Sequence, residues 1–344
     1  MIESVHLRNY GKITDLQANS LGKINLIVGT NGCGKTFLLK SLYTAIKSVE
    51  ELGRGDDVRN IVDILSERLR WCFQTKKLGD LVKKGTKEHL AFDMSCGAGK
   101  IISYTFSNST EVKVNHVVCT HPPRNENSIF LPAKEVLSLY NIINEYSRIQ
   151  KRFGFDSTYS DLIEALSIAP HRGKNYKVFS LARESLFKLL GGKADFDSKK
   201  NEWYYKEGSM KFPIGSASEG VKKLSILDRL LANGYLSRDS VIFIDELESA
   251  LHPRAISEFI KLIAEMAEQM NIQFFISTHS YHVVKSLHLV AVKKNIPTPF
   301  ISFEKDEENN AVYKVADLRD EVPDNPIILE SIRIFEEEME LAFQ

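Results

Sequence analysis

One stretch, GTNGCGKT at residues 29–36, constrains the fold of this chain more than any other. It matches the pattern G-x-x-x-x-G-K-[ST], and it lies between an apolar run at residues 24–28 and the amphipathic segment FLLKSLYTAI. Glycines let successive backbone N–H groups turn inward around an anion, and the following helix adds the partial positive charge of its N-terminus. A plain glycine-rich turn is the alternative. The flanking strand and helix favour an α/β fold that binds nucleotide phosphates at this turn.

Each part of this loop has an expected role toward a nucleotide. Lys35 is expected to reach the β- and γ-phosphates, and the Thr36 hydroxyl is expected to ligate Mg²⁺. The sequence therefore predicts ATP and Mg²⁺ as ligands. The predicted nucleotide-binding residues are Gly29, Thr30, Asn31, Gly32, Cys33, Gly34, Lys35, Thr36 and Phe37.

A second apolar stretch, SVIFID, ends in two consecutive carboxylates, Asp245 and Glu246. Open α/β sheets bind ligands at the carboxyl ends of their strands. Asp245 is expected in the Mg²⁺ shell, directly or through a water, and Glu246 is expected to act as general base on the attacking water. Taken alone, the pair reads better as a cap for the next helix. Combined with residues 29–36, it indicates catalysis.

The next apolar stretch, QFFIST, is followed by His279. An ordinary polar loop residue is the alternative interpretation. Because this strand is expected beside the one that ends in Asp245, the imidazole is predicted to reach the γ-phosphate as a sensor. It would donate to the phosphate and orient the water. Lys35, Glu246 and His279 are thus the predicted catalytic residues, with Thr36 and Asp245 as the metal ligands.

The segment IGSASEGVKKLSIL, residues 214–227, has two compatible interpretations. Ser216 and Glu219 are spaced as a capping box that starts a helix. Ser218 and Gly220, at the same helix start, are also placed to hold a phosphate.

The order of these motifs resembles the ATP-binding-cassette (ABC) ATPase superfamily, and most of all the branch with SMC, RecF and OLD (overcoming lysogenization defect) ATPases. The likeness rests on LRNYGKITDL before INLIVGTNGCGKT, on ASEGVKKL, on DELESALHP and on ISTHS, and it covers residues 1–45 and 214–290. It implies an α/β ABC head with a mixed or parallel core sheet, an N-terminal antiparallel part and a helical signature lobe.

The resemblance also implies that two heads sandwich two ATP molecules. Ser218, Glu219 and Gly220 would then contact the ATP of the other subunit, and residues 249–253 would line the same seam. The signature lacks the second glycine and the glutamine of transporters, having Glu219 and Val221 instead.

Three features stay open at this stage. The region that holds a glutamine in relatives offers Lys134 and Glu135 here. Candidates beside the adenine are Arg8, Asn9 and Tyr10, and an ordinary turn is the alternative. The spacing of His116, Cys119 and His121 is loosely metal-like but lacks a fourth ligand, which favours a plain strand and loop.

The composition of the chain indicates which partners and which cell compartment to expect. Hydrophobic residues make up 43% and charged residues 26% of the sequence, and the formal net charge is zero, so no global attraction to nucleic acid or anionic membrane is expected. The four cysteines contain no CxxC pair, and no apolar run approaches a membrane span. These features predict a cytoplasmic protein.

The motifs divide the chain into four parts: residues 1–133 with the phosphate loop, a helical lobe with a hairpin at 134–215, the signature and catalytic core at 216–303, and an acidic tail at 304–344. Residues 301–344 carry 13 acidic against 4 basic side chains. A helix expected at residues 325–343 has apolar residues at 328, 332, 335, 339 and 342. This stripe indicates either core packing or a docking surface for a partner.

The absences shape the functional hypothesis. The segment between phosphate loop and signature lacks sustained heptads, unlike SMC arms, and the segment after His279 lacks the acidic cluster of a Toprim domain. We therefore expect an ATPase switch that forms head-to-head homodimers or higher oligomers and controls a separate nuclease or toxin in anti-phage defence. A RecF-like DNA-binding repair ATPase is the alternative, and transport is a weaker third.

Overall fold

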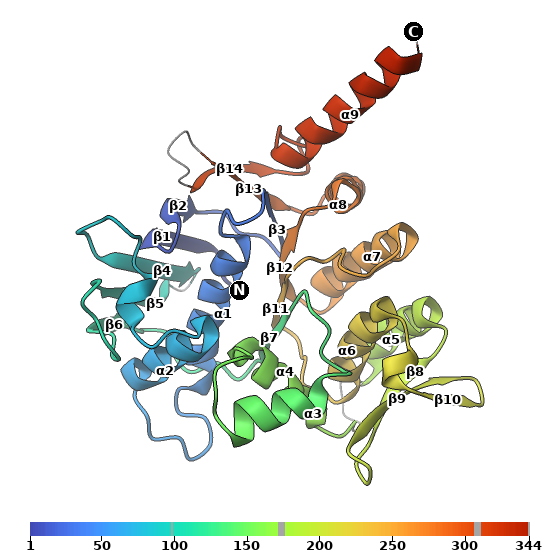
Figure 1. The fold of residues 1–344 in the computed structure, drawn as a ribbon, viewed down its shortest axis with the longest axis horizontal. Coiled ribbons are helices and arrows are strands. Elements are labelled where there is room, and N and C mark those ends of the chain that lie inside the picture. Colours follow the sequence, from blue (N-terminus) through green and yellow to red (C-terminus); the bar gives the residue numbers. More distant parts are fainter. Residues whose placement is uncertain (98, 171–175, 306–310, 343–344) are drawn as a thin grey trace.

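The computed structural model describes residues 1–344 except 98, 171–175, 306–310 and 343–344. Its centre is a large mixed sheet with the strand order β6-β5-β4-β1-β2-β14-β13-β3-β12-β11-β7. Helices cover both sides of its central strands (Figure 1). The strands are β1 (Ser4–Tyr10), β2 (Ile13–Ala18), β3 (Ile24–Gly29), β4 (Leu90–Cys96), β5 (Gly99–Phe106), β6 (His116–Val118), β7 (Ser128–Leu131), β11 (Val241–Ile244), β12 (Gln273–Thr278), β13 (Pro299–Lys305) and β14 (Ala311–Asp317).

The sheet has a parallel and an antiparallel part. Strands β13, β3, β12, β11 and β7 pair in parallel, whereas β2, β1, β4, β5 and β6 pair antiparallel. Strand β14 joins the two, because it pairs antiparallel with β13 and bridges to β2 in parallel. The expected α/β class, with a parallel core and an N-terminal antiparallel part, is confirmed.

The central parallel strands are buried on both faces. Every residue of β3, β11 and β12 is buried, which explains why these strands read as continuous apolar runs. Helix α1 (Lys35–Glu51) packs on one face, where Tyr43 contacts the rings of Phe130 and Phe243. Helices α6 (Glu219–Ala232), α7 (Pro253–Gln269) and α8 (Tyr281–Lys294) cover the other face (Figure 1).

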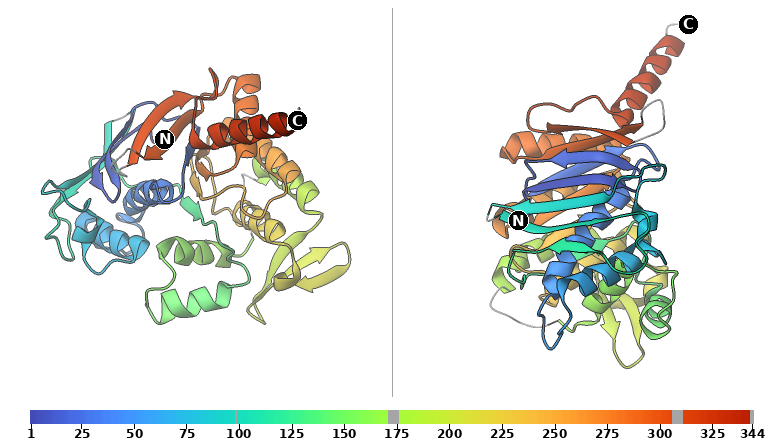
Figure 2. Two further views of the ribbon diagram at one scale, coloured as in Figure 1. Left: turned by 45° about the horizontal axis from the view of Figure 1, so that its top comes forward. Right: turned by 90° about the vertical axis from the view of Figure 1, so that its left-hand side faces the viewer.

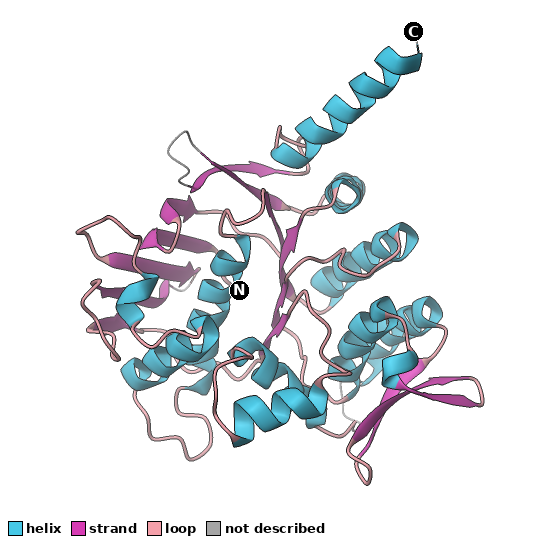
Figure 3. Ribbon diagram, in the orientation of Figure 1, coloured by secondary structure: helices cyan, strands magenta, loops and turns pink. Residues whose placement is uncertain are grey.

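A helical lobe lies between β7 and β11 in the sequence. It contains α3 (Tyr140–Ile143), a π-helical turn (Asn144–Ile149), α4 (Ser157–Ser167) and α5 (Tyr176–Leu190). A small sheet follows, formed by β8 (Lys193–Asp197), β9 (Glu202–Glu207) and β10 (Met210–Pro213), and Figure 3 shows it apart from the large sheet. The hairpin predicted here is confirmed and extended by a third strand.

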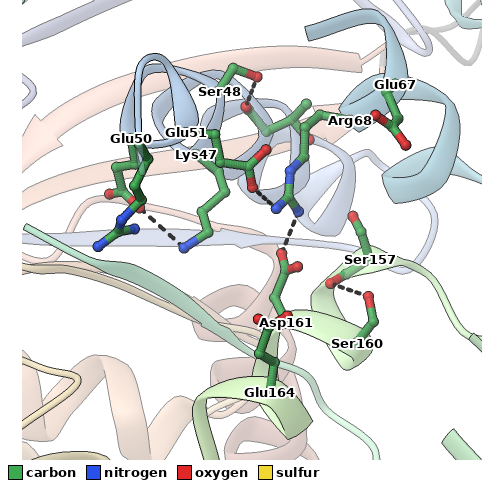
Figure 4. A network of polar contacts seen from close by, with 12 residues as sticks. Lys47, Ser48, Glu50, Glu51, Glu67, Arg68, Ser157, Ser160, Asp161 and Glu164 are labelled. Carbon is green, nitrogen blue, oxygen red and sulfur yellow. Dashed lines mark hydrogen bonds and ion pairs between the residues drawn. The ribbon is translucent and has the colours of Figure 1, made fainter. Parts of the chain in front are cut away.

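Polar contacts tie this lobe to the helix that follows the phosphate loop (Figure 4). Asp161 of α4 accepts hydrogen bonds from Tyr43 of α1 and from Arg68 of α2 (Ile61–Phe73), both at 2.6 Å. Arg68 also pairs with Glu51 at the end of α1. Because Asp161 and Arg68 are largely buried, the lobe and the phosphate-loop helix are held together by charges that water screens poorly.

The C-terminal helix α9 (Pro326–Ala342) leaves the body of the molecule (Figures 1 and 2). Of the described residues 326–342, Ile328 alone is buried. Core packing of the apolar stripe is therefore wrong beyond the first turn. None of the described helices has the length and apolarity that a bilayer crossing needs.

Candidate active site

The loop between β3 and α1 has the backbone of an anion site. Gly32 and Gly34 adopt φ angles of 71° and 110°, which residues with side chains rarely adopt. Gly34 is the N-cap of α1, and no side-chain hydrogen bond caps this helix end. The first N–H groups of α1 are therefore left for a ligand at the positive end of the helix.

Lys35, the first residue of α1, is buried and points into this loop. Its Nζ donates to the carbonyl oxygens of Gly29, at 2.9 Å, and Thr30, at 3.0 Å. Burial lowers the pKa of the ammonium, and the nearby Cys33 thiol and Asp245 carboxyl partly oppose that shift. The ammonium is thus held at the loop, beside any phosphate that the loop binds.

The two predicted metal ligands lie face to face. The Thr36 hydroxyl donates to both carboxylate oxygens of Asp245, at 2.9 and 3.0 Å, and the Ser277 hydroxyl donates to Asp245 Oδ1 at 2.6 Å. A hydroxyl from α1 and a carboxylate from the end of β11 are oxygen donors, which Mg²⁺ accepts together with water and phosphate. The residues present therefore fit a magnesium ion bound with the nucleotide.

Glu246 stands on a strained turn directly after β11. Its φ angle is +50°, in the left-handed region that non-glycine residues rarely adopt. Its N–H donates to Ser277 Oγ at 2.9 Å, and its carbonyl accepts from the Ser249 N–H at 2.9 Å and from Lys223 Nζ at 2.6 Å. With its backbone fixed on both sides, the side chain is 44% exposed and lines the cavity described below.

His279 reaches the same place from the end of β12. Its Nε2 lies 3.9 Å from Glu246 Oε1. Burial, followed by the charge of Lys35, lowers the pKa of the imidazole, which favours the neutral ring with one N–H donor. Glu248 holds the strand end by accepting from the His279 backbone N–H and from the Thr278 hydroxyl.

One cavity of about 960 Å³ joins these groups. Its lining includes Lys35, Thr36, Glu246 and His279. Phe37 of α1 and Phe73 of α2 also line it, with ring centroids 4.6 Å apart and ring planes inclined at 45°. The remaining lining residues are Gly11, Lys12, Asn31, Gly32, Gly34, Lys40, Cys72, Gln74, Asp80, Val82, Lys84 and Asp156. These two rings offer an aromatic surface of the kind on which a nucleobase packs.

Of the adenine candidates from the sequence, Tyr10 lies closest to the cavity, because its ring packs against Phe37 and Phe73, with centroids 5.2 and 6.0 Å away. Tyr10 is buried, and its hydroxyl lies 3.1 Å from that of Tyr104. Asn9 donates to Glu88, and Arg8 is an exposed residue of β1. Phe73 was not predicted, because the sequence after α1 carries no motif that marks it.

The signature segment begins α6, but not through the predicted capping box. Ser216 lies in a 3₁₀ turn (Ile214–Ser216), and Ser218 is the N-cap, with its hydroxyl oxygen accepting from the Val221 N–H at 3.4 Å. Glu219 instead pairs with Lys222 at 2.7 Å. Ser218, Glu219 and Gly220 do not line the cavity of their own chain.

Gly220 brings the start of α6 against the turn that follows Glu246. A Cβ added to Gly220 would lie 2.8 Å from the carbonyl oxygen of Ala250, closer than real contacts allow. Three residues further on, Lys223 donates to the Glu246 carbonyl, and burial lowers its pKa to about 8. Neither contact was predicted, because they join residues 30 and 23 positions apart.

The loosely metal-like trio has another arrangement. The Cys119 thiol donates to the His121 carbonyl, and His116 is an exposed residue of β6. In the described part of the chain, no three His, Cys, Asp or Glu side chains gather as a metal site.

Comparison with known proteins shows the family to which the chain belongs. A family model described as AAA domain, putative AbiEii toxin, Type IV TA system matches residues 105–285, more than half of the chain. The chain belongs to this AbiEii-type AAA family. The matched region includes the signature segment, Asp245, Glu246 and His279, and the phosphate loop lies before it. The chain thus belongs to a family of P-loop AAA domains.

Two curated relatives of the AbiEii-type chain come from Methanocaldococcus jannaschii. One, Uncharacterized protein MJECL10, is 28% identical over 130 residues, which are 37% of this chain and 56% of the relative. The other, Uncharacterized protein MJECL11, is 30% identical over 96 residues, or 28% of this chain and 79% of the relative. The match spans only about half the length of the first relative.

Solved structures share the fold of this AbiEii-type chain. It is similar to an SMC head bound to the C-winged helix domain of ScpA, with a TM-score of 0.53 and 14% identity over 92% of this chain and 97% of that one. It also resembles a Pyrococcus furiosus Smc head with an extended coiled coil, bound to the C-terminal domain of ScpA, with a TM-score of 0.52 and 14% identity over 98% and 99% of the two chains. The resemblance to ABC-type, SMC-like heads is confirmed.

Proposed function

We propose that this chain hydrolyses ATP as a head-to-head homodimer and thereby controls a separate effector, a nuclease or toxin, in cytoplasmic anti-phage defence. One observation carries the ATPase part. Lys35, Thr36, Glu246 and His279 line one cavity and Asp245 bonds to Thr36 at its edge, whereas the signature residues of the same chain lie outside it. Such a division leaves the signature available for the nucleotide of a second subunit.

Different residues of the cavity bind different parts of the nucleotide. The N–H groups at the start of α1 hold the phosphates, and Lys35 exchanges the Gly29 and Thr30 carbonyls for phosphate oxygens. Thr36 and Asp245 would hold Mg²⁺, which neutralises phosphate charge when it is bound. Phe37 and Phe73 offer an aromatic surface to the base.

Hydrolysis then needs an activated water. Glu246 accepts the proton of the water whose oxygen attacks the γ-phosphorus, while the bond from that phosphorus to the β–γ bridging oxygen breaks and ADP leaves. Neutral His279 donates its N–H to a γ-phosphate oxygen, where charge develops. The braced backbone of Glu246 keeps the carboxylate at the cavity for this step.

The second subunit completes the site from outside. Ser218 Oγ and the N–H of Gly220, at the positive end of α6, would contact the γ-phosphate bound by the partner. SMC heads of similar fold are bound to domains of ScpA, a separate protein, and the family description names a toxin system. Both support a head that passes its ATP state to another protein.

The Glu246→Gln variant tests the ATPase and the dimer together. It should still bind ATP, hydrolyse it at least about 100-fold more slowly and accumulate as a dimer in size exclusion with light scattering. The matched Ser218→Arg variant should bind ATP as a monomer and stay monomeric. If Glu246→Gln stays monomeric with ATP and Mg²⁺, the homodimer part of the proposal is wrong.

The effector part has its own test. The chain should copurify in fixed stoichiometry with the product of an adjacent gene when both are expressed from the native operon. Absence of any stoichiometric partner, with and without ATP, would argue for a self-contained ATPase.

DNA binding is the second candidate function, and the small sheet favours it. Residues 193–213 carry five lysines, and Lys211 and Lys206 lie 3.6 and 5.2 Å from the ring centroid of Tyr204. Basic groups beside a half-buried aromatic ring suit a nucleic acid backbone and its bases. ATP-dependent, salt-sensitive binding of duplex DNA would favour this role, and no binding at low salt would dismiss it.

A further inference from the structure

Helix α9 is fixed at its base and free along most of its length. The buried Asn325 side chain accepts from the N–H groups of Ile327 and Ile328, at 3.1 and 3.3 Å, and donates to the Pro323 carbonyl at 2.8 Å. Ile328 is buried at the base, and the helix packs there against α8 and β3. From Leu329 to Ala342 the helix has no buried residue. Its direction is therefore set by the core, and the rest of the helix is exposed to solvent.

The exposed part of α9 carries an apolar seam. Ile328, Ile332, Phe335, Met339 and Ala342 follow one another at intervals of four, three, four and three residues, the a and d spacing of helices that pack against another helix. Within it, Phe335 is 60% and Ile332 46% exposed. Such a seam on an otherwise solvated helix marks an interaction site, and its spacing indicates that the occupant is a helix.

Acidic residues flank this 328–342 seam. In that register the e and g positions hold Leu329 and Ser331 near the base and Glu336 and Glu338 further out, and these positions set partner choice in paired helices. Among the described residues, neither glutamate has an ion-pair partner, and Arg333 is already paired with Glu330 and Glu337. Glu336, Glu338 and Glu340 also stand near the negative end of the helix dipole, where anions destabilise a helix. A cationic partner would relieve both effects.

We propose that the 328–342 seam docks a basic amphipathic helix of a separate protein. A second copy of α9, with five glutamates and one arginine over residues 326–342, would bring like net charge against like. Nucleic acid and anionic lipid are repelled by the same side chains, and helices that lie on membranes carry Lys and Arg on their polar face. The inference rests on the proposed function, in which the head controls a separate effector, and it specifies the docking chemistry.

Two designed peptides probe the seam on the full chain without nucleotide. Both have three heptads with Ile at a and Leu at d, one with Lys and the other with Glu at every e and g position. Fluorescence anisotropy at low salt should give the Lys peptide a Kd at least about tenfold tighter than that of the Glu peptide. Hydrogen exchange of residues 329–342 should slow only with the Lys peptide.

A matched pair of variants locates the binding. Ile332→Ser, on the seam, should weaken the Lys peptide about tenfold or more, whereas Ile334→Ser, equally exposed but off the seam, should change Kd less than threefold. The proposal is overturned if neither peptide binds, if both bind with equal affinity, or if both variants lose affinity equally. It is also overturned if the chain self-associates without nucleotide and Ile332→Ser abolishes that self-association. ATP-driven dimerisation of Glu246→Gln is measured in parallel. Because that measurement does not involve the peptides, it distinguishes a wrong docking proposal from a wrong ATPase proposal.

Discussion

Glu246 shows how much of this site depends on one backbone conformation. A left-handed φ at a glutamate is unfavourable by about 1–2 kcal/mol and persists only where surrounding contacts hold it. Ser277 accepts its N–H, while Lys223 and Ser249 donate to its carbonyl. Of these, Lys223 comes from the signature helix, so the orientation of the proposed general base depends on the position of α6.

Replacing Lys223 should therefore affect turnover more than binding. Lys223→Met removes the 2.6 Å hydrogen bond to the Glu246 carbonyl, and we expect kcat to fall about tenfold with KM changed less than threefold. Lys223→Arg, which can still donate, should recover part of the loss. Steady-state ATPase assays with thermal melts check this. A lower Tm with unchanged kcat would show that the contact serves stability alone.

Sequence reasoning was most successful for residues next to each other in a motif. Lys35, Thr36, Asp245, Glu246 and His279 come together because parallel strands end at one edge, and the order of strands and helices was enough to predict this. Ser277, Lys223 and Phe73 were missed because they act through side-chain contacts between distant segments. The prediction that Ser216 caps the helix is wrong for a local reason. The chain forms a 3₁₀ turn at Ile214–Ser216, and Ser218 is therefore the N-cap of the helix.

At the scale of elements, helix α6 both carries the signature residues and contacts the turn that holds Glu246. Its N-terminus carries the signature residues, and its first turns touch the catalytic turn of the same chain through Gly220 and Lys223. A movement of α6 on meeting a second subunit would therefore reach Glu246 through direct contacts. The absence of a Cβ at position 220 allows that close approach.

Gly220→Ala tests the close approach. The added methyl would meet the Ala250 carbonyl at 2.8 Å, so α6 must shift, and we expect a loss of about 1–2 kcal/mol in the free energy of unfolding. ATP binding by the monomer should persist while dimerisation is impaired. Gly215→Ala is the control, because no heavy atom lies within 4 Å of its added Cβ. Urea unfolding measures both, and equal stability of the two variants would contradict the argument.

At the scale of the whole molecule, the proposed sandwich makes a prediction about mixtures. Lys35→Ala damages the phosphate loop and Ser218→Arg damages the signature, so neither variant alone can build a working site. A heterodimer of the two variants has one site with both parts intact. An equal mixture should therefore hydrolyse ATP well above the level of either variant alone, and at most at about half of the wild-type rate, because each mixed dimer has one of two sites.

The ATPase rate of the mixture, against each variant alone at the same total concentration, measures this recovery. Activity that stays at the level of the separate variants, although mixed dimers form, would mean that each chain hydrolyses ATP without its neighbour's signature.

The anchored base of α9 also has a mechanical consequence. Seventeen residues at about 1.5 Å each make a rod about 25 Å long, held at one end against α8 and against β3, the strand that leads into the phosphate loop. A rotation of about 10° at the base would sweep the tip through about 4 Å, a displacement comparable to switching motions at subunit interfaces. The geometry amplifies motion: a rearrangement too small to alter contacts near the core becomes a shift large enough to change what the far end of the rod touches.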